Sequence, residues 1–239
     1  MNFLLWIAVL VGALFFLRVL MNRAMAEVYD LVIVRMTAKW YKAVFERLRT
    51  GDRVLDIGIG TGTALARNYA LVLQKKLAVV GIDYEEAYIV KARSVVKEVS
   101  LKDSVILYCK SVYDEQLSSL FSGDARFDAV YFSGSLTLMP DPPKALRIGA
   151  SMLKDGGRVY ITQTFQDRKS SWAEVVKPWL QTITTIDFGK VTYRTEMEAI
   201  ISRAGLTILE DGPVAGSIST AWQTARMYVL EHRADHRRL

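Results

Sequence analysis

The sequence predicts an α/β fold in which a mostly parallel sheet carries helices on both faces. Short apolar segments alternate with longer segments of helical periodicity, which is the pattern of consecutive β-α-β units. The first apolar segment, Arg53–Ile57, has the continuous hydrophobicity of a strand that is buried on both faces. At 239 residues the chain is long enough for one large core, so we expect a single folded domain.

The remaining strands and helices follow from the same alternation. We expect strands at Arg53–Ile57, Ala78–Asp83, Val105–Cys109, Ala129–Phe132, Arg158–Thr162, Leu206–Leu209 and Thr224–Leu230. We expect helices near Asp30–Arg49, from Thr63 onward, over Glu85–Val99, from Pro142 to Leu153, from Ser171 onward, and from Thr195 to Gly205. Asp141 and Pro142 suit an N-cap and a first helical residue, and Ser171 and Thr195 each begin a capping-box pattern.

A glycine-rich loop follows the first strand, with the sequence Asp56-Ile57-Gly58-Ile59-Gly60-Thr61-Gly62-Thr63. Glycine lets the backbone turn tightly and approach a ligand closely, and the helix that follows presents free N–H groups and a partial positive charge. The spacing is not that of the dinucleotide fingerprint, since Thr63 stands where that fingerprint has glycine. Asp56 would repel a pyrophosphate, so the loop favours a ligand with a positive group.

The N-terminus contains an apolar segment, Phe3–Leu17, that ends at Arg18. With the residues that follow, and with Arg18 reaching toward the interface, its length approaches the ~17–25 residues of a spanning helix. We expect a single-pass membrane anchor at residues 1–23, with the rest of the chain in the cytosol because Arg18 and Arg23 follow the segment. The alternatives are a signal peptide cleaved after Ala24-Met25-Ala26 and a buried N-terminal helix.

The charge pattern gives little support for a nucleic-acid partner. The net charge is only +6, and no basic stretch is interleaved with aromatic residues. The helix near Asp30–Arg49 has an apolar stripe and an opposite basic face that suits either anionic lipid headgroups or solvent. The stripe comprises Trp40, Tyr41, Val44, Phe45 and Leu48, and the basic face comprises Arg35, Lys39, Lys42 and Arg49. The last residues, 233–239, form a basic tail that we expect to be disordered.

Three further segments follow the glycine loop in an informative order. Asp83 ends the second predicted strand, about 20 residues beyond the glycines, where an acid can bind both hydroxyls of a ribose. Phe127-Asp128-Ala129-Val130 opens the fourth strand, and Leu153-Lys154-Asp155-Gly156-Gly157 precedes the fifth. Together with Asp56 and its loop, these segments resemble the motifs of class I S-adenosylmethionine (SAM)-dependent methyltransferases, in particular the ubiquinone and menaquinone type.

This resemblance implies a Rossmann-like fold with a seven-stranded, mostly parallel sheet over residues 24–232. It also implies that SAM is the cosubstrate, with its amino-acid end in the glycine loop, its ribose on Asp83 and its adenine against Tyr84. Ser133 would touch the methionine end, and Tyr29 would help to cover the ligand. The predicted SAM-binding residues are Tyr29, Asp56, Gly58, Gly60, Thr61, Gly62, Asp83, Tyr84, Ser111, Val112 and Ser133.

One segment departs from the family pattern. After the third strand the family usually carries Gly-Asp-Ala, whose acid accepts a hydrogen bond from the adenine amino group. This chain has Lys110-Ser111-Val112 there, so Ser111 would be a weaker acceptor, and backbone atoms near Val112 or the carboxylate of Asp114 are the alternatives.

No catalytic residue and no metal ligand is predicted. SAM carries its own leaving group, so holding the acceptor in line supplies much of the acceleration. The histidines, His232 and His236, lie at the C-terminal end and are poor candidates for a base, and no metal-binding pattern is present. Cys109 ends an apolar strand, and we expect it to pack in the core.

The acceptor is left open by these motifs. The apolar N-terminus and the aromatic segment Trp172–Phe188, where this fold builds its acceptor lid, favour a small lipophilic acceptor at a membrane. A protein methyltransferase, an NAD(P)-dependent oxidoreductase on a related fold, and a catalytically inactive SAM-binding membrane module are the alternatives.

Overall fold

The computed structural model describes residues 33–166 and 192–232. From Met36 onward, these residues belong to one compact unit. In the described part of the chain, no helix combines the length and hydrophobicity needed to cross a membrane. The predicted anchor at residues 1–23, Tyr29, the aromatic segment Trp172–Phe188 and the tail at 233–239 lie outside the described residues.

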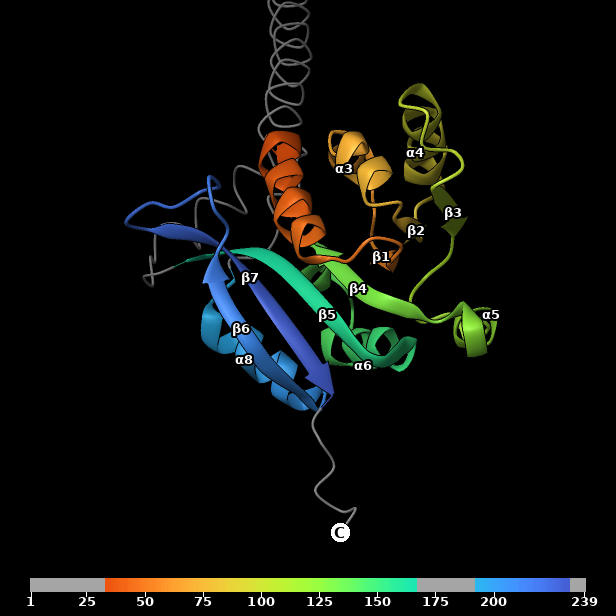
Figure 1. Ribbon diagram of the computed structural model, residues 1–239. Helices are drawn as coiled ribbons and strands as arrows, with labels where there is room; N and C mark the ends of the chain where they lie inside the picture. Colours follow the sequence, from red (N-terminus) through yellow and green to blue (C-terminus); the bar gives the residue numbers. More distant parts are fainter. Residues whose placement is uncertain (1–32, 167–191, 233–239) are drawn as a thin grey trace, which may run out of the picture. The chain divides into compact units, whose positions relative to one another are not determined.

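The described residues contain a seven-stranded sheet with the strand order β3-β2-β1-β4-β5-β7-β6. Strands β1 to β5 pair in parallel, and β7 is inserted antiparallel between β5 and β6. The predicted fold class is therefore confirmed for the sheet (Figure 1). The strands are β1 (Arg53–Ile57), β2 (Ala78–Asp83), β3 (Val105–Cys109), β4 (Phe127–Ser133), β5 (Leu153–Gln166), β6 (Leu206–Pro213) and β7 (Gln223–His232).

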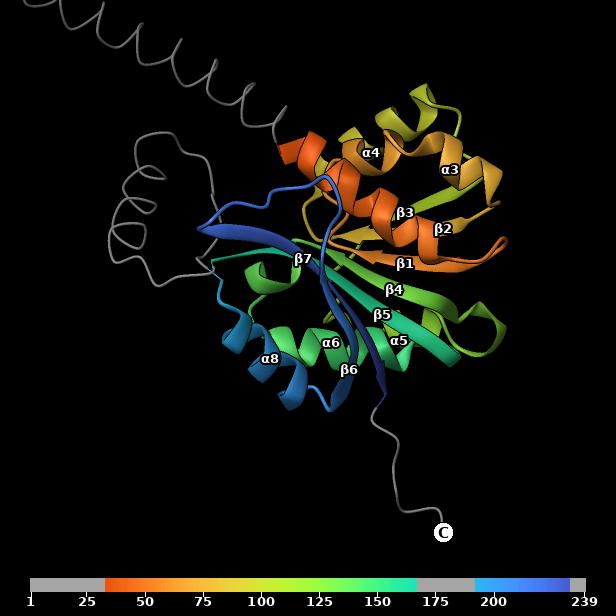
Figure 2. The same ribbon diagram turned by 60° about the vertical axis from the view of Figure 1, so that its left-hand side comes forward.

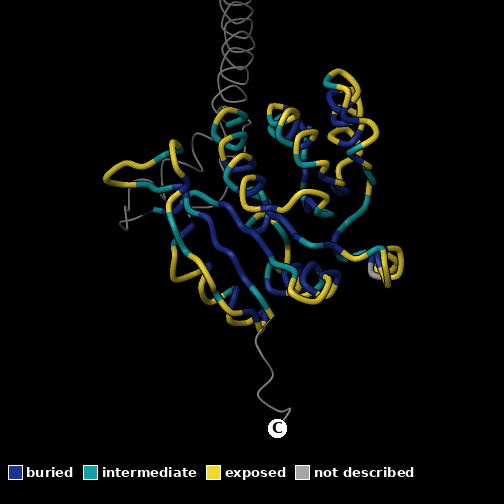
Figure 3. Tube along the Cα trace, in the orientation of Figure 1, coloured by how far each residue is buried: buried dark blue, intermediate teal, exposed yellow. Residues whose placement is uncertain are grey.

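Two layers of helices cover the sheet. A helix over residues 33–47 lies on one face with α2 (Thr63–Ala66), α3 (Tyr69–Gln74) and α4 (Glu86–Glu98). The opposite face is covered by α5 (Leu117–Leu120), α6 (Pro142–Ser151) and α8 (Arg194–Arg203) (Figures 1 and 2). Successive strand residues face opposite layers, so Val54 packs under the first set of helices and Leu55 under the second. The sheet is consequently the most deeply buried part of the unit (Figure 3).

The helix over residues 33–47 follows its predicted amphipathic pattern. All five residues of the predicted stripe are buried, whereas Lys39, Lys42 and Glu46 are exposed. Lys42 forms an ion pair with Glu46 one turn later. The indole N–H of Trp40 donates to the hydroxyl of Ser217 in the loop between β6 and β7, with the two atoms 2.9 Å apart. This helix is therefore fixed both to the sheet and to a distant loop.

The fifth strand is much longer than predicted. Its first residue, Leu153, is not the end of a helix but pairs with Phe127 of β4, and a bulge between Phe127 and Ala129 accommodates the turn at Gly156. At its other end β5 continues through Gln166 because β7 pairs with it over eight successive positions, from Val159 to Gln166. Pairing with a partner distant in sequence, rather than local hydrophobicity, sets the length of this strand.

One predicted helix start is confirmed and another is displaced. Asp141 caps α6, where its carboxylate accepts the backbone N–H of Lys144 at 3.0 Å. The capping box predicted to begin at Thr195 is wrong by two residues. The observed box begins at Tyr193, whose backbone N–H donates to the carboxylate of Glu196. The backbone is held extended up to this point because the carbonyl of Thr192 accepts the N–H of Gln166 at 3.0 Å.

The prediction that Cys109 packs in the core is wrong. Strand β3 is the edge of the sheet and is only partly covered, so Cys109 is exposed. Its thiol lies 3.7 Å from the carbonyl oxygen of Tyr84.

Candidate active site

The site lies where the order of the strands reverses. From β1 the chain proceeds outward through β2 to β3, and it then returns to place β4 on the other side of β1. In sheets of this kind, ligands bind outside the carboxyl ends of the strands at such a switch point. The carboxyl ends of β1, β2 and β4 meet there, where the loop Gly58–Gly62 follows β1, Asp83 ends β2 and Ser133 ends β4. The topology therefore brings the predicted residues of these three strand ends to one place.

Backbone hydrogen bonds hold the glycine loop against β2. The N–H groups of Gly58 and Ile59 both donate to the carbonyl of Ile82, at 2.8 and 3.1 Å. Gly81 lies beneath the loop, and a Cβ at that position would come within 2.4 Å of Ile59. The missing side chain at Gly81 leaves room for the side chains of Ile59 and Leu107 under the loop.

The three glycines of the loop all have positive φ values, but their surroundings differ. A Cβ on Gly58, whose φ is +78°, would lie 2.5 Å from the Cβ of Ser135. A Cβ on Gly62 would lie 3.2 Å from Ala92 of α4. Around Gly60, whose φ is +58°, no atom lies within 4 Å of the Cβ position. Gly58 is thus required by protein packing, Gly62 is packed closely against α4, and Gly60 borders open space that a ligand can occupy.

Alanine substitutions should separate these roles. We expect Gly58→Ala to destabilise the fold by ~2–4 kcal/mol, from overpacking against Ser135 and from its positive φ. Gly60→Ala should cost only ~1–2 kcal/mol of stability, yet weaken SAM binding at least tenfold by filling the ligand's space. Thermal unfolding and calorimetric titration with S-adenosylhomocysteine measure the two effects. Equal loss of binding and stability in both variants would contradict this assignment.

The helix after the glycine loop begins at Thr63, as predicted, and is short. Helix α2 covers only Thr63–Ala66, and α3 begins separately at Tyr69. A single turn aligns few peptide dipoles, so the expected partial positive charge at this helix start is small. Thr61 uses its hydroxyl locally, 3.0 Å from that of Thr63. Ligand charge at this site is therefore balanced chiefly by side chains.

Asp83 organises the second strand end. It is 7% exposed, and its two carboxylate oxygens accept the N–H groups of Gly60 at 2.9 Å and of Glu85 at 3.0 Å. Each carboxylate oxygen has a second lone pair, so Asp83 can still accept two hydroxyl groups from a ligand. Tyr84 follows with 78% of its surface exposed. The geometry suits a ribose on Asp83 with a flat ring system beside Tyr84.

Asp56 is the most deeply buried charged side chain of the site. It is 1% exposed, and its Oδ2 accepts a hydrogen bond from the hydroxyl of Tyr41 at 2.6 Å. Its Oδ1 is buried and has no hydrogen-bond partner among the described residues. Burial raises the pKa of Asp56 to about 7; the bond from Tyr41 acts to lower it, and the charge of Asp83 raises it. An unpaired buried acceptor of this kind suits a cationic ligand group.

Tyr41 was not predicted as part of the site. Its ring packs edge-to-face against Phe45 and Tyr131, with ring centres 5.5 and 5.0 Å away. Burial and the nearby charge of Asp56 raise the pKa of Tyr41 well above its ordinary value, so its hydroxyl stays protonated and donates. In the sequence Tyr41 is one member of an apolar stripe, and nothing local distinguishes it from a core residue.

The fourth strand end contributes two serines. Ser133 ends β4 with its hydroxyl oxygen buried. Ser135, which was not predicted, donates its hydroxyl to the carbonyl of Ile57 at 2.5 Å. This bond ties the loop after β4 to the end of β1, next to Gly58.

The third strand end carries the departure from the family pattern. The N–H of Lys110 donates to the carbonyl of Asp83 at 2.9 Å, which places this segment beside the ribose position. The Ser111 hydroxyl accepts the N–H of Tyr113 at 3.2 Å, and Val112 is buried. Asp114 is already bound by Lys110 at 2.7 Å and by the N–H of Gln116 at 2.9 Å. Ser111 is therefore better placed than Asp114 to take part in ligand contacts.

Comparison with known proteins gives the family. A family profile described as a methyltransferase domain matches residues 24–211. The chain belongs to this family. Phosphatidylethanolamine N-methyltransferase of Cereibacter sphaeroides is 29% identical over 127 residues, which cover 53% of this chain and 58% of that protein. Ubiquinone biosynthesis O-methyltransferase of Pseudomonas aeruginosa (strain LESB58) is 30% identical over 162 residues, with 66% of each chain covered.

The solved structures support the same fold. The SAM-dependent methyltransferase of Geobacter sulfurreducens in complex with S-adenosyl-L-homocysteine has a TM-score of 0.57 and 15% identity, with 82% of this chain and 90% of that chain covered. The methyltransferase fold and SAM as the cosubstrate are thus confirmed, whereas the individual SAM contacts stay predictions.

The described part of the methyltransferase shows neither a histidine at the site nor a metal centre. His232 ends β7 with its Nε2 3.0 Å from the carbonyl of Ala150, and its register opposite Leu206 places it at the other end of the sheet from Asp83. Among the described residues, no group of three His, Cys, Asp or Glu side chains could hold a metal ion. The described site thus offers binding and positioning groups rather than an imidazole base.

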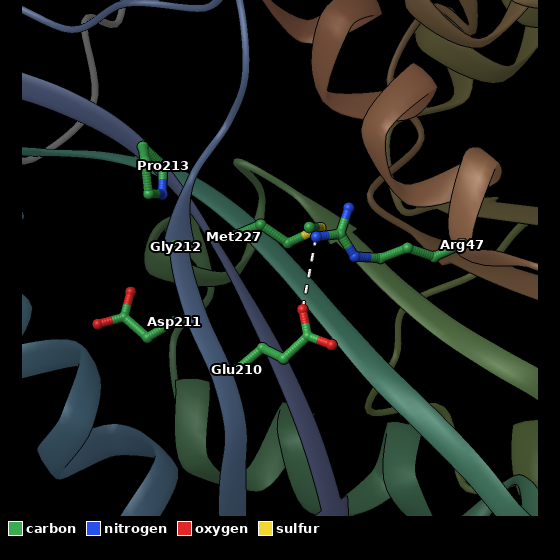
Figure 4. Close-up of a pocket in the computed structure, with 6 residues that line it drawn as sticks. All are labelled: Arg47, Glu210, Asp211, Gly212, Pro213 and Met227. Atoms are coloured by element: carbon green, nitrogen blue, oxygen red, sulfur yellow. Dashed lines mark hydrogen bonds and ion pairs between the residues drawn. The ribbon is translucent and has the colours of Figure 1, made fainter.

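A separate hollow of about 310 Å³ lies at β6 and β7 (Figure 4). In the strand order, β4 and β5 separate it from β1 and the glycine loop. Arg47 pairs across it with Glu210 at 3.4 Å, and Asp211 is bound by Arg194 and Arg226 at 2.6 and 2.7 Å. Because these charges satisfy one another, the hollow is not a candidate for the SAM site.

Proposed function

We propose that this protein transfers the methyl group of SAM to a small lipophilic acceptor at the cytosolic surface of a membrane. The observation that supports the SAM half of this proposal best is the group formed by Asp56, Gly60 and Asp83. It combines an unpaired buried acceptor, open space at a glycine and a second carboxylate tied to that glycine. SAM offers an ammonium group for Asp56 and ribose hydroxyls for Asp83, and the chain between them can occupy the space beside Gly60.

In this proposal each strand end binds one part of SAM. Asp83 accepts the two ribose hydroxyls, while Tyr84 packs against the adenine. Asp56 Oδ1 accepts the ammonium group, and Ser133 contacts the methionine chain. Ser111 and Val112 border the adenine in place of the usual acid.

A dinucleotide is a poorer fit to the same loops. Pyrophosphate sites rely on backbone N–H groups and on the positive end of a helix. Here the helix is one turn long, and the buried carboxyl of Asp56 lies at the end of β1, just before the glycine loop. A doubly charged pyrophosphate would be repelled by the ionised carboxylate of Asp56. The NAD(P)-dependent oxidoreductase is therefore disfavoured.

Methyl transfer depends mainly on the alignment of the acceptor atom with the methyl group of SAM. SAM supplies an electrophilic methyl group on a sulfonium, and the residues at the switch point hold it in a fixed orientation. The described site contains no histidine that could act as a base. We therefore infer an acceptor whose reacting atom already has a free lone pair, such as an amine, a thiolate, or the ionised hydroxyl of an acidic phenol or enol.

Two features support a lipophilic acceptor. The chain is similar to proteins named for phosphatidylethanolamine methylation and for ubiquinone biosynthesis, both of which involve lipid-soluble molecules. The apolar segment Phe3–Leu17 has nearly the length of a membrane anchor. The exposed Lys39 and Lys42 lie on the first described helix after that segment, where they could meet anionic headgroups.

Transfer of a labelled methyl group tests the proposal. Full-length protein is incubated with methyl-labelled SAM and, in separate reactions, phosphatidylethanolamine vesicles, vesicles containing a demethylated quinol, water-soluble thiols, and a protein extract. We expect label in the organic extract of a vesicle reaction at a rate at least ten times that with the soluble thiols or protein. Asp83→Ala is the inactive control.

The other outcomes identify the alternatives. Label confined to the protein extract would support a protein methyltransferase and refute a lipophilic acceptor. Affinity for S-adenosylhomocysteine without transfer to any acceptor class, even in whole lipid extracts, would support an inactive binding module. No affinity for SAM or S-adenosylhomocysteine would overturn the assigned site itself.

A further inference from the structure

The Tyr41–Asp56 hydrogen bond joins two residues that the methyl-transfer chemistry does not use directly. Tyr41 lies on the helix over residues 33–47, and Asp56 lies at the end of β1. Their contact is short, 2.6 Å, and fully buried. It occupies one oxygen of the carboxyl and leaves the other, Oδ1, without a partner among the described residues.

We propose that Tyr41 is a positioning residue for SAM, because it holds Asp56 so that Oδ1 faces the ammonium group of the ligand. This inference rests on the proposed contact between Asp56 and SAM. A carboxyl group free to rotate would point either oxygen at the ligand, whereas a hydroxyl fixed on Oδ2 leaves a single acceptor in a single orientation. The ring of Tyr41 is itself held by Phe45 and Tyr131, so its hydroxyl is rigidly placed.

The same bond also influences the charge of Asp56. The groups that face Asp56 from the neighbouring described elements are Tyr41 on the helix, Asp83 on β2 and Tyr131 on β4. Of these, Asp83 opposes ionisation of Asp56, and the hydroxyl of Tyr41 favours it. Because the ligand's ammonium group attracts the ionised carboxylate, Tyr41 strengthens binding both by geometry and by charge.

The variant Tyr41→Phe tests this inference. It keeps the ring and its packing and removes only the hydroxyl. We expect the affinity of the full-length protein for S-adenosylhomocysteine to fall about tenfold at pH 6 to 7, because Asp56 is then less ionised and no longer held in one orientation. The loss should shrink to about threefold or less at pH 9, where Asp56 is ionised in both proteins. Calorimetry measures both dissociation constants at each pH. Their ratio, variant to wild type, is independent of the titration of the ligand itself.

Tyr160→Phe is the matched control. Its ring is buried in the same hydrophobic layer as that of Tyr41, but it lies on β5, which β4 separates from Asp56 on β1. We expect a ratio of dissociation constants near one, without dependence on pH. Thermal unfolding of both variants shows whether each is folded.

A double-mutant cycle separates the possible failures. Tyr41→Phe should have less than a twofold effect in an Asp56→Asn background, because the carboxylate that it positions is gone. If Asp56→Asn alone binds like the wild type, the proposed SAM site is wrong. If Asp56→Asn binds weakly and Tyr41→Phe binds normally, or loses affinity equally at every pH, only the role of Tyr41 is refuted.

Discussion

The variant Asp83→Ala is expected to bind SAM and S-adenosylhomocysteine at least about a hundredfold more weakly than the wild type. In the proposed site, two hydrogen bonds from ribose hydroxyls to the Asp83 carboxylate are lost, and each is worth ~1.5–3 kcal/mol. The substitution also releases the N–H of Gly60, which the carboxylate holds at 2.9 Å, so the glycine loop loses part of its fixed shape. Isothermal titration calorimetry measures the loss directly.

A neighbouring acid supplies the control for this experiment. Glu85 is exposed, and only its backbone N–H contacts Asp83, so Glu85→Ala should leave the affinity within about twofold of the wild type. Asp83→Asn keeps the size and one acceptor oxygen, and we expect an intermediate loss of about tenfold. Unchanged affinity in Asp83→Ala, with the protein folded, would show that the ribose lies elsewhere.

The variant Asp56→Asn should change how the stability of the unliganded protein depends on pH. Burial raises the pKa of Asp56 from 3.8 to about 7, so between these values the folded protein holds a proton that the unfolded chain has released. The folded state binds more protons in this window, and its stability therefore falls as the pH rises through it. The full effect is a few kcal/mol.

Denaturant unfolding at pH 4.5, 6 and 8 measures this contribution. We expect the wild type to lose ~2–4 kcal/mol more than Asp56→Asn between the lowest and the highest pH. The exposed residue Asp103 provides the control, since Asp103→Asn should follow the wild type. Parallel curves for Asp56→Asn and the wild type would mean that Asp56 is ionised throughout the range.

The strands near the site could be predicted closely from the sequence. The bounds of β1, β2 and β3 agree with the predicted segments, because each is a short and mainly apolar run between polar or turn-forming residues. Parallel connectivity then brings Asp83 and the glycine loop together, since the carboxyl ends of the strands share one edge. The proximity of Asp83 and the glycine loop thus follows from the hydrophobic pattern of the strands and their parallel order.

The parts that could not be predicted depend on contacts between distant residues. The pairing of Tyr41 with Asp56 is a property of how a helix lies on a sheet, and in the sequence Tyr41 has the same periodicity as Val44. The extension of β5 to Gln166 requires the presence of β7. The exposure of Cys109 follows from the place of β3 at the edge, which its apolar sequence does not reveal.

The first described helix has a consequence for shortened forms of the chain. Trp40 and Tyr41 are consecutive, and one binds the loop between β6 and β7 while the other binds Asp56. A deletion that extends into this helix would remove the hydroxyl that binds Asp56 of the proposed cosubstrate site, together with the residues that precede the helix. Loss of activity after such a deletion would therefore not test the proposed membrane anchor. Removal of residues 1–23 alone spares Trp40 and Tyr41 and is the deletion that tests it.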